Sequence, residues 1–119
     1  MMKTALIGLM CLCTIAHADI NPWQKSEVQH LLQFVADSPC EFERNGDKVN
    51  GADAAEHMLK KYQHFAKDIS NTEDFIRLAA SKSEVSGKPY LVYCKNVPMI
   101  ASADYLRNEL GKYRLANGK

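Results

Sequence analysis

Apolar residues recur every three to four positions in several parts of the chain, a pattern typical of amphipathic helices. In 25–38 the apolar face consists of Val28, Leu31, Leu32 and Val35. Similar spacing recurs in 51–69, 71–83 and 102–114. We therefore predict helices over these four ranges. In 51–69, the longest, the apolar stripe consists of Ala55, Met58, Leu59, Tyr62, Ala66 and Ile69.

Polar residues at the start of each predicted helix fit N-terminal caps. Ser26 followed by Gln29 fits a capping box in the first helix. Side chains that can accept a hydrogen bond from the first turn precede the other helices. The candidate caps are Asn50 for 51–69, Asn71 or Thr72 for 71–83, and Ser102 for 102–114.

Two segments between the helices predict β-hairpins. In 40–50 the dipeptide Asn45-Gly46 favours a type I′ turn, because both central residues of that turn need positive φ. In 88–100 we expect a strand, a tight Lys95-Asn96 turn and a return strand. Pro98 cannot donate to a ladder, so the return strand should lie at a sheet edge.

The predicted order of elements is α-β-β-α-α-β-β-α. Local hairpins separated by helices favour an α+β fold over a parallel α/β fold. We expect a small antiparallel sheet packed against about four helices, in one domain spanning 19–119, since about 100 residues suit a single domain.

The first eighteen residues are typical of a secretory signal peptide. Lys3 precedes an apolar run over 4–15, and the small residues of "AHA" at 16–18 favour cleavage after Ala18. A short membrane anchor is the alternative, although the run is shorter than the roughly 20 residues that span a bilayer. We therefore expect a periplasmic or secreted protein with no membrane contact after cleavage.

The charge balance of residues 19–119 limits the partners that we expect for this part of the chain. Without Lys3, 14 basic residues face 14 acidic ones. This balance argues against nucleic acid and anionic membranes as partners, because both require a basic excess.

Cys40 and Cys94 are the cysteines of residues 19–119. In an exported chain they predict one disulfide, and their wide separation does not match the spacing of zinc ligands.

The serine-rich segment 81–90, SKSEVSGKPY, invites a catalytic or phosphate-binding reading. It lacks the glycine spacing of a phosphate loop and joins a helix to a strand, which is the opposite order. The S-x-x-K spacing of serine acyltransferases is also absent. The simpler interpretation is a helix end followed by a turn, with Gly87 adopting positive φ and Pro89 leading into the strand.

A few polar residues could carry chemistry. His57, Lys61 and His64 should lie on the polar side of the helix 51–69. His57 has Asp53 one helical turn away and could act as a general base, although exposed ion pairs have the same spacing. Arg44 could bind a carboxylate, although it shares a strand face with Phe42 and so could be partly buried. Of Tyr90 and Tyr93, one should face outward, where it could anchor an interface or simply pack on the sheet.

The motifs FERNGDKV, ADAAEHMLKKY, NTEDFIRLAASKS and SGKPYLVYC follow one another in this chain. In this order they resemble a YfeK-like family of small exported bacterial proteins, classed as a domain of unknown function. The resemblance covers about 26 to 114 and implies an exported bacterial protein without implying an activity. The polar residues that fit the family pattern are Arg44, Asn45, His57, Lys61, Ser81, Ser83, Lys88 and Tyr90.

We hypothesise that these polar residues converge where the first hairpin turn, the long helix and the serine loop meet. The predicted function is a non-enzymatic binding or interaction module, whose partner is an envelope protein or a small anionic ligand. No catalytic residue, metal or cofactor is assigned. The alternatives are a small hydrolase or transferase using His57 with Ser81 or Ser83, and a purely structural polar network.

Overall fold

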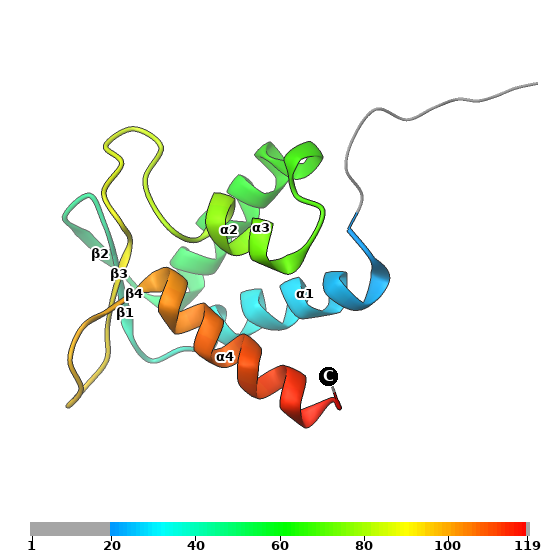
Figure 1. The fold of residues 1–119 in the computed structure, drawn as a ribbon. Coiled ribbons are helices and arrows are strands. Elements are labelled where there is room, and N and C mark those ends of the chain that lie inside the picture. The colour runs from blue at the N-terminus through cyan, green and yellow to red at the C-terminus, as the bar shows by residue number, and fades with distance from the viewer. Residues whose placement is uncertain (1–19, 119) are drawn as a thin grey trace, which may run out of the picture.

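The computed structural model describes residues 20–118, and the predicted signal segment lies outside this range. Figure 1 shows the helices gathered beside a small sheet. The elements are α1 (Pro22–Ala36), β1 (Glu41–Arg44), β2 (Asp47–Val49), α2 (Gly51–His64), a 3-10 turn η1 (Ala66–Asp68), α3 (Thr72–Ala79), β3 (Leu91–Tyr93), β4 (Ile100–Ala101) and α4 (Ser102–Ala116). The predicted α+β class and element order are confirmed.

The two hairpins join into one antiparallel sheet with the strand order β2-β1-β3-β4. Phe42 of β1 lies opposite Val92 of β3. The predicted disulfide is present, with 4.5 Å between the Cα atoms, and it joins Cys40, just before β1, to Cys94, just after β3. The expected edge position of the return strand is confirmed for β4.

Turn geometry follows the sequence in the first hairpin and departs from it in the second. Asn45 and Gly46 have φ of 53° and 86°, as a type I′ turn requires. The predicted tight turn at Lys95-Asn96 is wrong in its length, since 94–99 connect β3 to β4. Asn96 still has a positive φ, 66°.

All four predicted helices are present, but the sequence predicted their ends less accurately. α1 begins three residues before the expected start, with Asn21 at the N-cap and Pro22 in the first turn, so the capping box at Ser26 is wrong. A proline suits this position because its missing N–H has no partner within the helix anyway. Ser102 is also not a cap, since Ala101 occupies that position and Ser102 lies buried inside the helix.

The other two caps are confirmed. Asn50 accepts a hydrogen bond from the backbone N–H of Asp53, and Asn71 accepts one from that of Asp74. Both helices end earlier than predicted, α2 at His64 instead of 69 and α3 at Ala79 instead of 83. The residues released from α3 begin a loop over 80–90 that is central to the candidate site.

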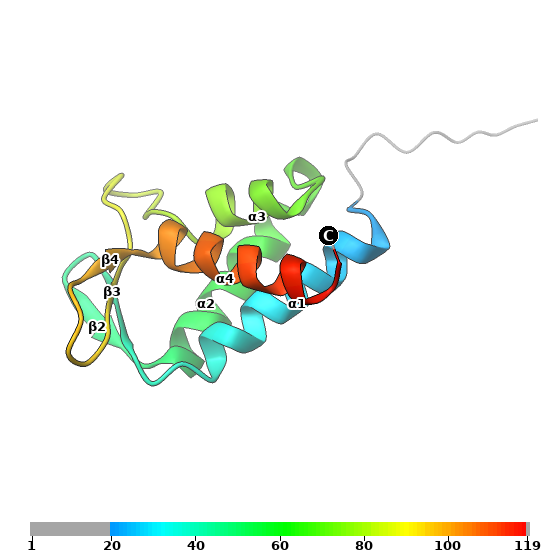
Figure 2. The same cartoon turned by 60° about the horizontal axis from the view of Figure 1, so that its bottom comes forward.

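The core lies among the four helices and on the inner face of the sheet. Its fully buried members include Val28, Leu31, Val35, Phe75, Ile76, Val92 and Leu106. Figure 2 shows α4 lying across α1 and α2, with the sheet at one end of the helical layer. α2 and α4 both contact the sheet. Asp53 and Ala54, near the start of α2, line a cavity together with residues of β1 and β2.

The predicted apolar and polar faces of the helix 51–69 are wrong at three positions. Leu59 is 41 % exposed and Ala66 is exposed, whereas Lys61, expected on the solvent side, is buried. Ala55 and Met58 are buried as predicted. Lys61 is buried because the loop 80–90 folds over this side of α2.

A buried ion pair fastens α1 to α4. Glu27 has no exposed surface and accepts two hydrogen bonds from Arg114, at 2.8 and 2.9 Å. The hydroxyl of Thr72, at the start of α3, donates to the same carboxylate at 2.6 Å. Three helices therefore meet at one carboxylate.

Within the described range, no helix is long and apolar enough to cross a membrane.

Candidate functional site

The candidate site lies where the β1–β2 turn, α2 and the loop 80–90 meet. Figures 1 and 2 both show this loop, drawn in yellow-green between α3 and β3, beside the hairpin turn. Its shape is set by local bonds: the backbone N–H of Ser83 donates to the carbonyl of Lys88, and that of Gly87 donates to the carbonyl of Ser83. Gly87 has φ of 74°, as expected for the turn.

Lys61 fixes the loop to α2. Its ammonium donates to the backbone carbonyl of Lys82 at 2.7 Å, to the Tyr90 hydroxyl at 3.1 Å and to the Glu84 carboxylate at 3.3 Å. A buried ammonium is costly unless its protons are bound, and these three acceptors match its three donors. Lys61 is therefore held by the loop that covers it.

Tyr90 connects Lys61 to His57. The Tyr90 side chain is buried, so of the two tyrosines it is not the one that faces outward. His57 Nε2 lies 3.2 Å from the Tyr90 hydroxyl. Burial lowers the pKa of His57, and the positive charges of Arg44 and of the lysines of α2 lower it further. A neutral His57 can accept a hydrogen bond from the Tyr90 hydroxyl, while the oxygen of that hydroxyl accepts one from Lys61.

The loop is also held by the hairpin turn. The side-chain amide of Asn45 donates to Ser83 Oγ at 3.0 Å, and Ser86 Oγ donates to the side-chain oxygen Oδ1 of Asn45 at 2.5 Å. Ser83 Oγ also accepts from the backbone N–H groups of Val85 and Ser86. The serines thus serve to shape the loop and to attach it to β1–β2.

Two of the predicted site residues lie apart from this network. Ser81 donates its hydroxyl to the carbonyl of Ile76 at 2.6 Å, which satisfies the C-terminal end of α3. Lys88 is exposed and lines a separate shallow hollow with Asn45 and Leu91. The structure brings together Asn45, His57, Lys61, Ser83 and Tyr90, with Arg44 beside them.

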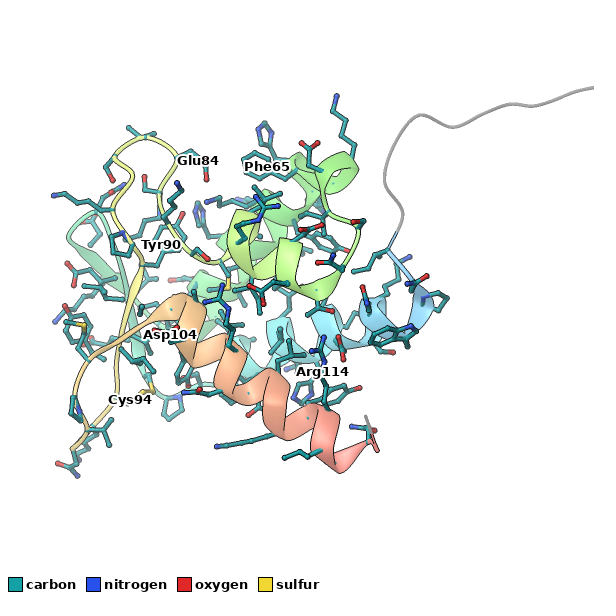
Figure 3. The ribbon with its side chains drawn as sticks, viewed as in Figure 1. Phe65, Glu84, Tyr90, Cys94, Asp104 and Arg114 are labelled. Carbon is teal, nitrogen blue, oxygen red and sulfur yellow. A yellow bond between two sulfur atoms is a disulfide. The ribbon has the colours of Figure 1, made fainter. Side chains whose placement is uncertain are left out.

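A basic hollow opens beside this network. It has a volume of about 300 Å³ and lies between α2 and the loop; among its lining residues are Arg44, Lys60, His64, Phe65 and Glu84. In Figure 3, Glu84 on the loop faces Phe65 at the end of α2, with Tyr90 between the loop and the sheet. We call this the basic hollow.

The charge of the basic hollow is predominantly positive. Its lysine and arginine lining residues are Arg44, Lys60 and Lys61, against the single carboxylate of Glu84. Arg44, for which partial burial was one alternative, is exposed. In the described part of the chain, neither Arg44 nor Lys60 forms a side-chain hydrogen bond or ion pair. Two cations therefore remain available to a ligand.

Lys60 and Glu84 were missed in the sequence. Residues 57, 60, 61 and 64 follow the i, i+3, i+4, i+7 spacing that places them along one side of α2. This spacing could have identified Lys60 as a neighbour of His57. Nothing in the sequence pointed to Glu84, whose position depends on the folded loop.

The histidine and serine side chains of the site are engaged by other partners. Across residues 20–118 no cluster of three or more His, Cys, Asp or Glu side chains could hold a metal ion. His57 has Tyr90 as its hydrogen-bond partner, and Ser81 and Ser83 are bonded elsewhere. A serine nucleophile needs its hydroxyl within hydrogen-bond reach of a base, and no such bond to His57 occurs among the described residues.

Comparisons with known proteins agree with the motifs. The chain is 33% identical over 87 residues to a protein of Salmonella typhimurium described as uncharacterized protein YfeK, which covers 72% of each chain. No solved structure matches this chain. Residues 22–114 match the model of a family described as a family of unknown function, DUF5329, and this chain belongs to that family.

Proposed function

We propose that this protein is a non-enzymatic binding module that takes an anionic group in the basic hollow. The observation that carries the proposal is the pair of cations, Arg44 and Lys60, that have no side-chain partner in the described chain. Beside them, the Tyr90 hydroxyl is bonded to both Lys61 and His57. The network thus provides a shaped wall, and the two cations supply the attraction.

A carboxylate is the anion that fits this arrangement best. A guanidinium presents its N–H donors in a fixed fork that matches a carboxylate, and a lysine ammonium adds a point charge. The local excess of positive charge attracts anions although the whole chain has a formal net charge of only +1. The ligand could be a small molecule or an exposed acidic group of another protein, and both would use these cations.

We place this binding outside the cytoplasm. The Cys40–Cys94 disulfide supports an oxidising compartment, since such bonds persist there and are rare in the cytosol. The N-terminal segment, with cleavage after Ala18, supports export to the periplasm. The location remains part of the proposal, and it limits the ligands to those of the envelope.

The proposal is tested by calorimetric titration of the protein with N-acetylglycine and with inorganic phosphate at low salt. Arg44→Gln/Lys60→Gln should weaken the binding of N-acetylglycine by about tenfold or more, because each charge-assisted bond contributes about 1.5–3 kcal/mol. Binding should also weaken as salt is added.

The matched control removes two exposed lysines far from the hollow, in Lys25→Gln/Lys112→Gln. This variant loses the same formal charge, so it separates local binding from the overall field. Equal losses of affinity in the two double variants, or none in either, would contradict the proposal. Circular dichroism and urea unfolding of each variant establish that the fold is unchanged.

A further inference from the structure

A second cavity adjoins the basic hollow and has a different character. It lies between the β1–β2 hairpin and α2, and its volume is about 130 Å³. Its apolar lining comes from Phe42, Val49, Ala54 and Met58. We call it the apolar slot.

The apolar slot is suited to a small hydrocarbon group. An engineered cavity of about 150 Å³ lined by apolar side chains binds benzene, so a space of this size accepts a branched aliphatic side chain and excludes a long acyl chain. Phe42 and Met58 are almost completely buried, at 4 % and 3 % exposed, so the floor is part of the core and is largely preformed.

The slot and the basic hollow meet at shared residues. Arg44, His57 and Tyr90 line both cavities. A single ligand can therefore place an apolar group in the slot while its anionic group lies near Arg44 and Lys60. The reverse arrangement is unfavourable, because Glu43, Asp47 and Asp53 line the slot and would repel an anion there.

The acidic side of the slot supplies a third element of recognition. In the described part of the chain, the carboxylates of Asp47 and Asp53 form no side-chain hydrogen bond or ion pair. Glu43, by contrast, accepts a hydrogen bond from the Tyr93 hydroxyl. Two free acceptors thus line the slot, whereas Lys60 lines only the basic hollow.

We propose that the ligand is the C-terminal residue of a peptide with an aliphatic side chain, and this inference rests on the proposed function. The terminal carboxylate binds Arg44 and Lys60, the side chain fills the apolar slot, and the peptide N–H faces Asp47 or Asp53. A carboxylate, an aliphatic branch and an N–H donor on one carbon are the groups that these three surfaces complement.

The test is a series of small probes titrated into the unmodified protein: N-acetyl-L-leucine, N-acetylglycine and N-acetyl-L-leucinamide. We expect N-acetyl-L-leucine to bind about tenfold or more tightly than N-acetylglycine, since even one methylene in an apolar pocket discriminates by roughly 10–200-fold. N-acetyl-L-leucinamide, which lacks the carboxylate, should bind about tenfold or more weakly than N-acetyl-L-leucine.

A variant that fills the slot supplies an independent check. Ala54→Leu should abolish the preference for leucine over glycine and leave the affinity for N-acetylglycine within about twofold. If this variant fails to fold, the comparison of the three probes on the unmodified protein still decides the inference.

The outcomes separate the two proposals. Equal affinity for the leucine and glycine probes overturns the role of the slot and leaves the basic hollow as an anion site. Equal affinity for N-acetyl-L-leucine and its amide overturns the carboxylate contact, and with it both proposals. The absence of binding by all three probes at millimolar concentration also overturns both.

Discussion

Replacing Arg114 by leucine should destabilise the protein far more than the same replacement at Arg107. Both arginines lie on α4 and each donates two hydrogen bonds to one glutamate, Arg114 to Glu27 and Arg107 to Glu73. The difference lies in burial. Glu27 has no exposed surface, whereas the side chains of Arg107 and Glu73 are 46% and 54% exposed.

The magnitude follows from the bonds that each variant loses. Two hydrogen bonds to charged groups contribute about 3–6 kcal/mol at about 1.5–3 kcal/mol each. The Arg114 side chain is 38% exposed, so we take the lower end, about 3 kcal/mol. This corresponds to a Tm lowered by roughly 12–24 °C at about 4–8 °C per kcal/mol. An exposed pair is worth about 1 kcal/mol or less, which sets the expectation for Arg107→Leu.

The assay is urea unfolding followed by circular dichroism, with the free energy of unfolding extrapolated linearly to water. A cost below about 1 kcal/mol for Arg114→Leu, or equal costs for the two variants, would refute the reasoning. A third variant isolates the buried charge: Glu27→Leu/Arg114→Leu should be more stable than Arg114→Leu alone, because the buried carboxylate has also been removed.

Three further predictions test the fold and the site. Gly51→Ala should cost about 2 kcal/mol or more, since an added Cβ would lie 2.2 Å from the backbone carbonyl oxygen of Val35; unchanged urea unfolding would contradict this close approach. Cys40→Ala/Cys94→Ala should lower the free energy of unfolding by about 4 kcal/mol, as expected for a disulfide that joins residues 54 apart; a loss below about 1 kcal/mol would argue against the linkage. The lowered pKa of His57 means that the unfolded chain takes up this proton first as pH falls, so stability should decrease from about pH 6.5 towards the folded-state pKa. The unfolding free energy of His57→Gln should lack this contribution, and identical pH profiles of the two proteins would show that it is absent.

Local patterns were sufficient for much of the fold. Asn45-Gly46 defined its hairpin turn because positive φ at two successive residues depends on those residues themselves. Asn50 and Asn71 were correct as caps because a cap bonds to the backbone three residues away. The cysteine count and the expected compartment were enough to predict the disulfide.

The features that could not be predicted from the sequence depend on contacts between residues far apart in the chain. Lys61 was placed on the solvent side of α2, and it is buried because a loop more than twenty residues later supplies three acceptors. The burial of Glu27 depends on its partner Arg114, which lies 87 residues away. The serines suggested a nucleophile, yet their bonds to Asn45 and to backbone groups show that they shape the loop.

The most direct test of the account is the mapping of amide chemical shifts in the ¹⁵N-labelled protein during titration with N-acetyl-L-leucine. The account predicts that the largest saturable changes lie at Arg44, along 57–61 of α2 and in the loop 83–90, and that they disappear in Arg44→Gln/Lys60→Gln. Changes centred on the α1–α4 surface, or none at millimolar probe, would contradict the claim that the basic hollow is a ligand site.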